Sequence, residues 1–127
     1  MDLSFPKKEK LKRKKLFEQL FAEGKGISNY PVKLIYLRTA LPEDVRFQAG
    51  VTVSKRNFKK AVHRNRIKRL LREGYRLNKH LLFNNIEGNF AFLFLYIGKE
   101  MPQYHQVETS MKAILYKLVE KNGTAKK

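Results

Sequence analysis

Residues 90–97 read Phe-Ala-Phe-Leu-Phe-Leu-Tyr-Ile, an uncharged, apolar run that Gly88 and Gly98 bound on its two sides. The run is short and rich in aromatic residues, which favours a β-strand over a helix. A strand with one solvent-facing side alternates apolar and polar residues, and this one does not. We therefore predict a central strand that other elements cover on both faces.

The segments around this strand predict helices and further strands. From Val45 to Val53 apolar residues alternate with polar or small ones, as in a half-buried strand. The other expected elements are helices at 10–23, 61–77 and 104–121, a strand at 32–37, a short extra strand near 27–29, and a loop at 78–89. The order predicts one α+β domain over 1–127, a small α/β sandwich with flexible ends at 1–9 and 122–127.

The 127-residue chain carries a formal net charge of +17, from 28 basic and 11 acidic residues. Such a surface attracts polyanions, so nucleic acid is the first candidate partner and an anionic membrane surface the second. The absence of cysteine excludes a disulfide scaffold, a zinc ribbon and thiol chemistry, and fits a reducing cytosol. The run 90–97 falls well short of the roughly 20 residues of a membrane helix, and the N-terminus lacks a secretory signal.

The positive charge concentrates between Lys55 and Arg76, where ten basic residues minus one acid, Glu73, give +9 over 22 residues. On the helix expected at 61–77, the apolar stripe centres on Ile67 and Leu71. The side chains expected opposite that stripe are Asn65, Lys68, Arg69, Arg72 and Arg76. A solvated helix face usually alternates charge sign so that i, i+4 ion pairs form, whereas stacked like charges favour a bound polyanion.

Asn65 stands between Arg64 and Arg66 in this segment. Arginine makes bidentate hydrogen bonds to phosphate, and asparagine both donates and accepts toward a sugar or a base edge. The combination predicts recognition of a folded RNA through its backbone and shape. A solvated helix face and a helix in a DNA major groove are the alternatives, although no helix directly precedes 61–77 as in a helix-turn-helix.

Phe17 and Phe21 lie one helical turn apart beside the basic cluster 7–15. Two roles fit them: packing in the core, or an open aromatic strip on which unpaired bases stack while basic residues hold the backbone. Tyr36 fits either role. The histidines at 63, 80 and 105 have no ligand spacing and the acids form no pair, so we expect neither a metal site nor a catalytic residue.

The stretch 61–73, Ala-Val-His-Arg-Asn-Arg-Ile-Lys-Arg-Leu-Leu-Arg-Glu, resembles the signature of the bacterial ribonuclease P protein component family. The Arg-Asn-Arg triplet followed by Ile-Lys-Arg-Leu is the most specific part of that signature. The resemblance extends over nearly the whole chain. Residues 10–12 with Phe17, Phe21 and Gly24 resemble the first helix of the family, and 50–55 resembles the strand that precedes its basic helix.

The resemblance implies an α/β sandwich with a left-handed β-α-β crossover. It also implies a cytoplasmic accessory subunit that binds one catalytic RNA subunit, with neither DNA nor membrane as a partner. In this family the RNA subunit and its bound Mg²⁺ remove the 5′ leader from precursor tRNA, and the protein alone binds no cofactor. The protein holds the leader in a cleft between its first helix and its sheet.

Residue by residue, the resemblance implies RNA contacts by the basic helix. The implied RNA-binding residues are Arg64, Asn65, Arg66, Lys68, Arg69 and Arg72, and the charge pattern adds Arg76. The implied leader-cleft residues are Phe17, Phe21, Lys55 and an aromatic strand residue that falls at Ile35 or Tyr36. The segment 56–60 departs from the family because it lacks the glycine found in many members.

Three rival hypotheses share the basic charge. A ribosomal protein binds RNA without needing a clustered Arg-Asn-Arg face. A DNA-binding regulator would prefer a duplex to precursor tRNA. A nuclease that acts without RNA would need acidic residues that the sequence does not bring together.

Overall fold

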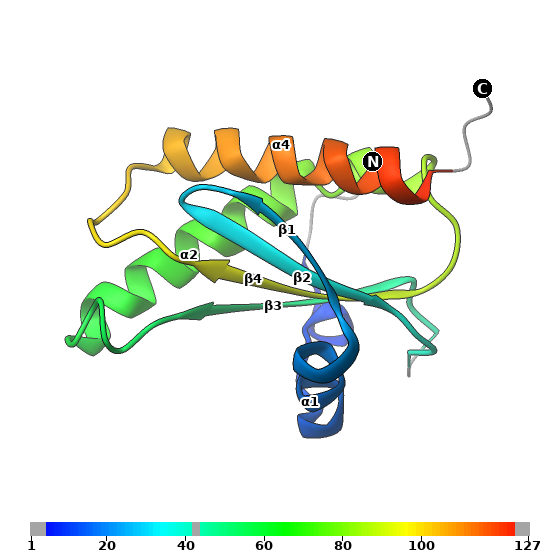
Figure 1. Ribbon diagram of the computed structural model, residues 1–127, viewed down its shortest axis with the longest axis horizontal. Coiled ribbons are helices and arrows are strands. Elements are labelled where there is room, and N and C mark those ends of the chain that lie inside the picture. Colours follow the sequence, from blue (N-terminus) through cyan, green and yellow to red (C-terminus); the bar gives the residue numbers. More distant parts are fainter. Residues whose placement is uncertain (1–4, 42–43, 124–127) are drawn as a thin grey trace.

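The computed structural model describes residues 5–41 and 44–123, which form an α+β sandwich (Figure 1). A four-stranded sheet lies between α1 on one face and α2 with α4 on the other. The elements are the 3-10 helix η1 (Lys7–Glu9), α1 (Lys14–Glu23), β1 (Lys25–Asn29), β2 (Val32–Arg38), β3 (Phe47–Val53), α2 (Ala61–Asn78), α3 (His80–Phe83), β4 (Phe90–Tyr96) and α4 (Tyr104–Asn122). This arrangement confirms the predicted fold class.

The strands lie in the order β1-β2-β4-β3. β1 pairs with β2 and β2 with β4 in antiparallel fashion, whereas β3 and β4 are parallel neighbours. Parallel neighbours need a crossover connection, and α2 supplies it between β3 and β4. The left-handed sense of this β3-α2-β4 unit stays a prediction from the family resemblance.

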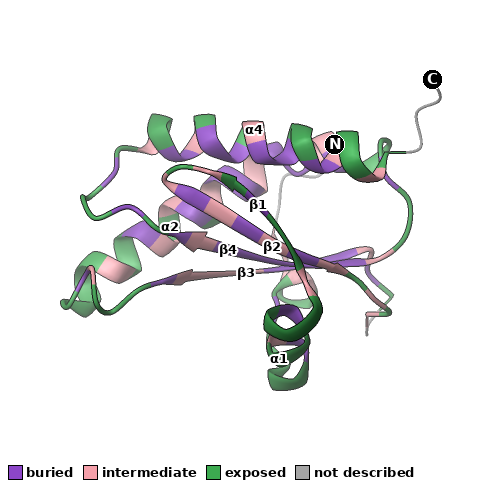
Figure 2. Cartoon of the chain, in the orientation of Figure 1, coloured by how far each residue is buried: buried purple, intermediate pink, exposed green. Residues whose placement is uncertain are grey.

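β4 is buried on both faces, as its uninterrupted apolar sequence predicts. Phe90, Phe92 and Phe94 join the core on the side of α2 and α4, and Ala91 and Leu93 join the core on the side of α1. All five are at most 1% exposed, and Figure 2 shows the buried colour along most of the strand. Each buried phenylalanine contributes about 1.5–3 kcal/mol to folding, so this strand holds the two helical layers together.

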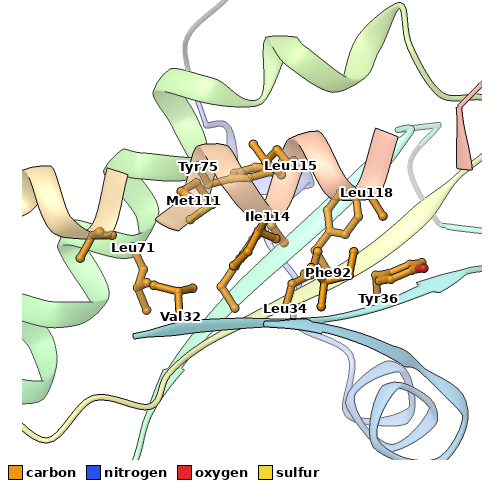
Figure 3. Close-up of a cluster of buried hydrophobic side chains, with 14 of the residues drawn as sticks. Val32, Leu34, Tyr36, Leu71, Tyr75, Phe92, Met111, Ile114, Leu115 and Leu118 are labelled. Carbon is orange, nitrogen blue, oxygen red and sulfur yellow. The ribbon is translucent and has the colours of Figure 1, made fainter. Parts of the chain in front are cut away.

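The larger core fills the space between the sheet and the pair α2 and α4. Figure 3 shows the side chains that meet there: Val32, Leu34, Tyr36 and Phe92 from the sheet, Leu71 and Tyr75 from α2, and Met111, Ile114, Leu115 and Leu118 from α4. The smaller core lies under α1, where Leu16 and Leu20 pack with Leu11, Ala91 and Leu93. None of the described helices has the length and apolar character needed to cross a membrane.

The first helix begins at Lys14, so the predicted start at residue 10 is wrong. Lys10 forms a parallel bridge with Ala49, and the Leu11 N–H donates to the Ala49 carbonyl at 2.9 Å. Leu11 fits the helical period in the sequence, yet its burial comes from this contact with β3. Gln48 is also buried and donates from Nε2 to the Lys8 carbonyl, so β3 is more covered than its alternation predicts.

The extra strand expected near 27–29 is confirmed as β1, and the expected loop 78–89 contains the one-turn helix α3. Of the ends expected to be flexible, residues 1–4 and 124–127 lie outside the described residues. Residues 5–9 contact α2 and β3, Asn122 is the last residue of α4, and Gly123 forms an isolated bridge with Ile86.

Two glycines offer a matched test of this packing. A Cβ at Gly24 would lie 2.5 Å from the Leu20 carbonyl oxygen and 2.6 Å from Ile35 Cγ2. A Cβ at Gly74, inside α2, would lie 3.6 Å from side chains of Met111 and Val107, an ordinary contact distance. We expect Gly24→Ala to lower the free energy of unfolding by about 1–3 kcal/mol through overpacking. Gly74→Ala should raise it by about 0.5–1 kcal/mol, because alanine loses less entropy in a helix.

Urea unfolding of the two variants and the parent protein measures both effects. Equal shifts of the two midpoints, or a stabilised Gly24→Ala protein, would contradict the packing described for α1 against β2.

Candidate nucleic-acid interface

The apolar side of α2 fixes the direction in which its basic side points. Ile67, Leu71 and Tyr75 are buried against the sheet and α4, and Gly74 is buried beside Met111 and Val107 of α4. The opposite side is open to solvent (Figure 2). There Asn65, Arg66, Arg69 and Arg72 are exposed, while Arg64, Lys68 and Arg76 are half-buried. The structure therefore confirms the predicted division of this helix into an apolar and a basic side.

We call the exposed side chains of Asn65, Arg66, Arg69 and Arg72 the basic face. Arg66, Arg69 and Arg72 follow one another at spacings of three residues, which places like charges side by side along the helix. The acid of this helix, Glu73, pairs with Arg76 at 2.7 Å instead. The basic face thus presents guanidinium groups as a row, and a row of cations is stabilised by a phosphate backbone.

Arg64 has a different role from its neighbours in the Arg-Asn-Arg triplet. Its Nη1 donates to the carbonyl of Phe58 at 2.9 Å and to that of Lys59 at 2.8 Å. These bonds tie the first turn of α2 to the connector that precedes it. We therefore assign Arg64 to holding the connector, and Arg66 to the solvent-facing row.

The connector 54–60 is held by hydrogen bonds and a ring contact, although it lacks the glycine that many family members have. The Phe58 N–H donates to the Ser54 carbonyl, the Ser54 hydroxyl accepts from the Arg56 N–H, and the Phe58 ring packs 5.9 Å from that of Tyr96. Among the described non-glycine residues only Asp44 has a positive φ. This connector therefore requires no left-handed residue, so the missing glycine costs nothing here.

A groove of about 230 Å³ lies where α1, α2 and β3 approach one another. Its lining residues are Phe5, Lys10, Leu11, Lys12, Phe17, Ala49, Gly50, Val51 and Arg72. Two phenylalanine rings and three cations thus share one depression. This combination of aromatic and basic side chains is typical of sites for single-stranded nucleic acid.

The leader-cleft residues predicted from the sequence are only partly brought together. Phe17 lies in the groove and packs against the smaller core. Phe21, one turn further along α1, is 62% exposed and lies outside the groove lining. Lys55 is exposed just beyond the end of β3 and lies outside the groove lining. It follows the groove residue Val51 by four residues, which corresponds to about 13 Å along an extended chain.

Tyr36 does not lie in the groove. Successive residues of a strand point to opposite faces, and Tyr36 shares its face with Val32 and Leu34, toward α4. It is 4% exposed, and its hydroxyl accepts from Asn122 Nδ2 at 3.4 Å. The neighbouring Ile35 points toward α1 and packs against the smaller core. Of the two aligned alternatives, the structure thus places Ile35, and not Tyr36, on the side of α1.

Burial, and secondarily the charge of Glu9, raises the pKa of Tyr75, while burial first and Glu108 second raise the pKa of Tyr104 to about 12. Both tyrosines therefore stay neutral at physiological pH. Within residues 5–41 and 44–123, no three His, Asp or Glu side chains gather where they could hold a metal ion.

Phe5 and Val51 line the groove, but no sequence pattern indicated that they lie beside a functional surface. Phe5 in particular is an isolated aromatic residue that precedes a proline and a run of lysines, so it has no periodic pattern. Its place in the groove depends on a contact with Tyr75, which is 70 residues away. Only the tertiary structure shows that contact.

Comparison with known proteins agrees with the geometry. The family model described as Ribonuclease P matches residues 5–119. The chain is 34% identical over 115 residues to the ribonuclease P protein component of Porphyromonas gingivalis, covering 88% of this chain and 84% of that protein. It is 36% identical over 125 residues to the corresponding protein of Dictyoglomus thermophilum, covering 97% and 95%.

Solved structures of similar fold include two from bacteria. The RNase P protein of Staphylococcus aureus aligns with a TM-score of 0.69 at 21% identity, over 87% of this chain and 94% of that one. The RNase P protein of Thermotoga maritima aligns with a TM-score of 0.64 at 24% identity, over 89% and 96%. At these identities the structures support the fold, and the family model and the sequence relatives support the family.

The different roles of Arg64 and Arg66 give a paired prediction. Both Arg64→Ala and Arg66→Ala remove one positive charge, but only the first removes the two hydrogen bonds to the connector. We expect Arg64→Ala to lower the free energy of unfolding by about 1–2 kcal/mol. Arg66→Ala should change it by less than about 0.5 kcal/mol, as for most surface positions. Thermal or urea unfolding measures both, and a loss for Arg66→Ala as large as that for Arg64→Ala would contradict the assignment.

Proposed function

The chain belongs to the ribonuclease P protein family, and from this premise we propose that its basic face binds the RNA subunit while its groove holds the 5′ leader of precursor tRNA. As a family member it is the protein component of the tRNA-processing endonuclease ribonuclease P, and the RNA subunit is its partner there. The proposal assigns the two binding tasks to two surfaces of the molecule. It includes one protein for each RNA subunit and a cytoplasmic location.

The basic face suits the RNA subunit because it is rigid and its charges are stacked. Buried Ile67 and Leu71 hold α2 in a fixed orientation, so the guanidinium groups of the row are arranged before RNA arrives. Each phosphate that they neutralise releases counterions and contributes about −0.7 to −0.9 to the log–log slope of affinity against salt. Asn65 adds a group that both donates and accepts hydrogen bonds at the same face.

The groove suits a single strand. Phe17 offers a ring on which a base stacks, and Lys10, Lys12 and Arg72 surround it with positive charge for the backbone. Stacking is largely independent of sequence, because every base has a π-face. That property fits a protein that handles the leaders of many different precursor tRNAs.

The observation that carries the proposal is the position of Arg72. It is an exposed member of the basic face and it also lines the groove with Phe17. The two surfaces are therefore continuous, and one RNA complex can occupy both at once. In the proposed complex, an RNA on the basic face has the groove beside it, where the 5′ leader would lie.

In this mechanism the protein binds and orients, and the RNA subunit carries the chemistry. The side chains of the interface are cations, amides and phenyl rings, which neutralise phosphate and position bases. Mg²⁺ would be held by the RNA subunit and not by residues of this chain, and it would supply the Lewis-acid chemistry of phosphodiester hydrolysis there. Holding the leader favours cleavage by fixing the scissile phosphate relative to that metal site.

The rivals make different predictions. A ribosomal protein would stay with ribosomes in high-salt gradients, and a DNA-binding regulator would bind a particular duplex more tightly than precursor tRNA. A nuclease acting without RNA would cleave precursor tRNA by itself. The basic face alone is compatible with the first two, whereas its continuity with an aromatic groove favours a partner that has both folded and single-stranded parts.

Removing one charge from the row should flatten the salt dependence of binding. We expect Arg69→Ala to weaken affinity for the RNA subunit and to reduce the magnitude of the log–log slope by about 0.7–0.9. Lys117→Ala removes the same charge from an exposed position of α4, away from the basic face, and serves as the matched control. Equal salt slopes for the two variants would show that α2 does not contact the RNA subunit.

Phe17 should act on the leader and not on the body of the tRNA. We expect the holoenzyme with Phe17→Ala to lose about 1–3 kcal/mol of affinity for precursor tRNA with a leader, through loss of base stacking, and none for mature tRNA. Because Phe17 also packs against the smaller core, Phe17→Leu is the companion variant that keeps apolar volume but no ring face. If both substrates lost affinity equally, Phe17 would act only through the core.

A further inference from the structure

Phe5 is a second aromatic side chain of the groove, contributed by the N-terminal segment. It is half-buried and lines the groove together with Phe17. The two rings pack on different sides of the sheet. Phe17 packs on the smaller core with α1, whereas the Phe5 ring lies 5.5 Å from that of Tyr75 on α2. The groove therefore has an aromatic ring packed on each side of the sheet.

An ion pair fixes the segment that carries Phe5. Lys79, at the end of α2, has a side chain that is only 2% exposed, and its Nζ lies 2.7 Å from Glu9 Oε1. The same Nζ lies 5.8 Å from the centre of the Phe5 ring, within cation–π distance. Breaking such a buried pair is costly because the buried ammonium loses a carboxylate that balances its charge. The position of Phe5 is thus tied to the position of α2.

Two hydrogen bonds, one from a side chain and one between backbones, continue the attachment along β3. Gln48 Nε2 donates to the Lys8 carbonyl at 2.9 Å, and the Leu11 N–H donates to the Ala49 carbonyl at 2.9 Å. Residues 5–11 therefore follow the edge of the sheet as a fixed wall of the groove. This wall also places Lys10 in the groove, where its Nζ lies 5.7 Å from the centre of the Phe5 ring.

We propose that Phe5 is a second stacking contact for a leader base and that the Glu9–Lys79 ion pair positions it. The proposal rests on the leader-binding role proposed above for the groove. A half-buried ring is suited to this role, since its inner part is anchored on Tyr75 while the rest reaches the groove. The neighbouring cations hold the phosphates on either side of the stacked base.

The experiment compares affinities of the reconstituted holoenzyme for precursor tRNA and for mature tRNA. Phe5→Leu keeps an apolar side chain against Tyr75 but removes the ring face. Tyr116→Leu makes a similar change at an exposed position of α4 and is the matched control. We expect Phe5→Leu to weaken precursor binding about fivefold or more, the effect of losing one stacked base, and to leave mature tRNA binding unchanged. Tyr116→Leu should change neither affinity.

The positioning role of the ion pair needs variants that fold. Glu9→Gln alone removes the carboxylate that faces a buried ammonium, so the double variant Glu9→Gln with Lys79→Met accompanies it. Melting temperatures show how far each variant is destabilised. We expect the folded double variant to lose the same precursor preference over mature tRNA as Phe5→Leu does. A purely structural role would lower the melting temperature and leave that preference intact.

The outcomes separate this inference from the proposed function. If Phe17→Ala reduces the precursor preference and Phe5→Leu does not, the groove binds the leader and the inference about Phe5 is overturned. If neither variant reduces it, the leader-binding role of the groove fails, and this inference fails with it. If Phe5→Leu reduces it and the double variant does not, the ring contact stands and the positioning role is overturned.

Discussion

Burial of β4 on both of its faces is the constraint on which the rest of the molecule depends. Its phenylalanines need cover from α2 and α4, and Ala91 and Leu93 need cover from α1. One strand therefore fixes two helical layers relative to each other. The groove exists because both layers, with the N-terminal segment, meet beside the edge strand β3, and the basic face exists because the apolar side of α2 is already occupied. The two surfaces proposed to bind RNA thus result from the way in which the apolar residues are buried.

Electrostatics then decides what these surfaces can do. A chain with a net charge of +17 attracts polyanions from any direction, but only a part of that charge is held in a defined geometry. Arg66, Arg69 and Arg72 stand on a helix that packing prevents from turning, so like charges remain adjacent at a cost in free energy that bound phosphate offsets. Arg64 and Arg76 belong to the same sequence cluster but have other partners. Arg64 bonds to the connector, and Arg76 pairs with Glu73. In the proposed account the protein supplies position and charge, and the RNA supplies the chemistry.

The sequence was informative wherever a local pattern reports burial. The uninterrupted run in β4 and the apolar stripe of α2 predicted the central strand and the outward face of the basic helix, and both are confirmed. It was less informative where burial depends on distant residues. Leu11 fits a helical period, but its burial comes from a contact with the edge strand β3. The family motif did not decide whether Ile35 or Tyr36 faces α1, and in the structure Tyr36 faces α4. Phe5 had no local signal, since its position depends on Tyr75 and on Lys79 through Glu9.

The most direct test of the central claim is a cleavage assay on precursor tRNA labelled at its 5′ end, at low Mg²⁺. Bacterial ribonuclease P RNA alone, the protein alone and the two together are compared. The account predicts that only the mixture releases the intact leader at an appreciable rate, because the protein lowers the Mg²⁺ requirement by positioning substrate and RNA. Equal cleavage by the RNA with and without the protein would contradict the account, and so would cleavage by the protein alone.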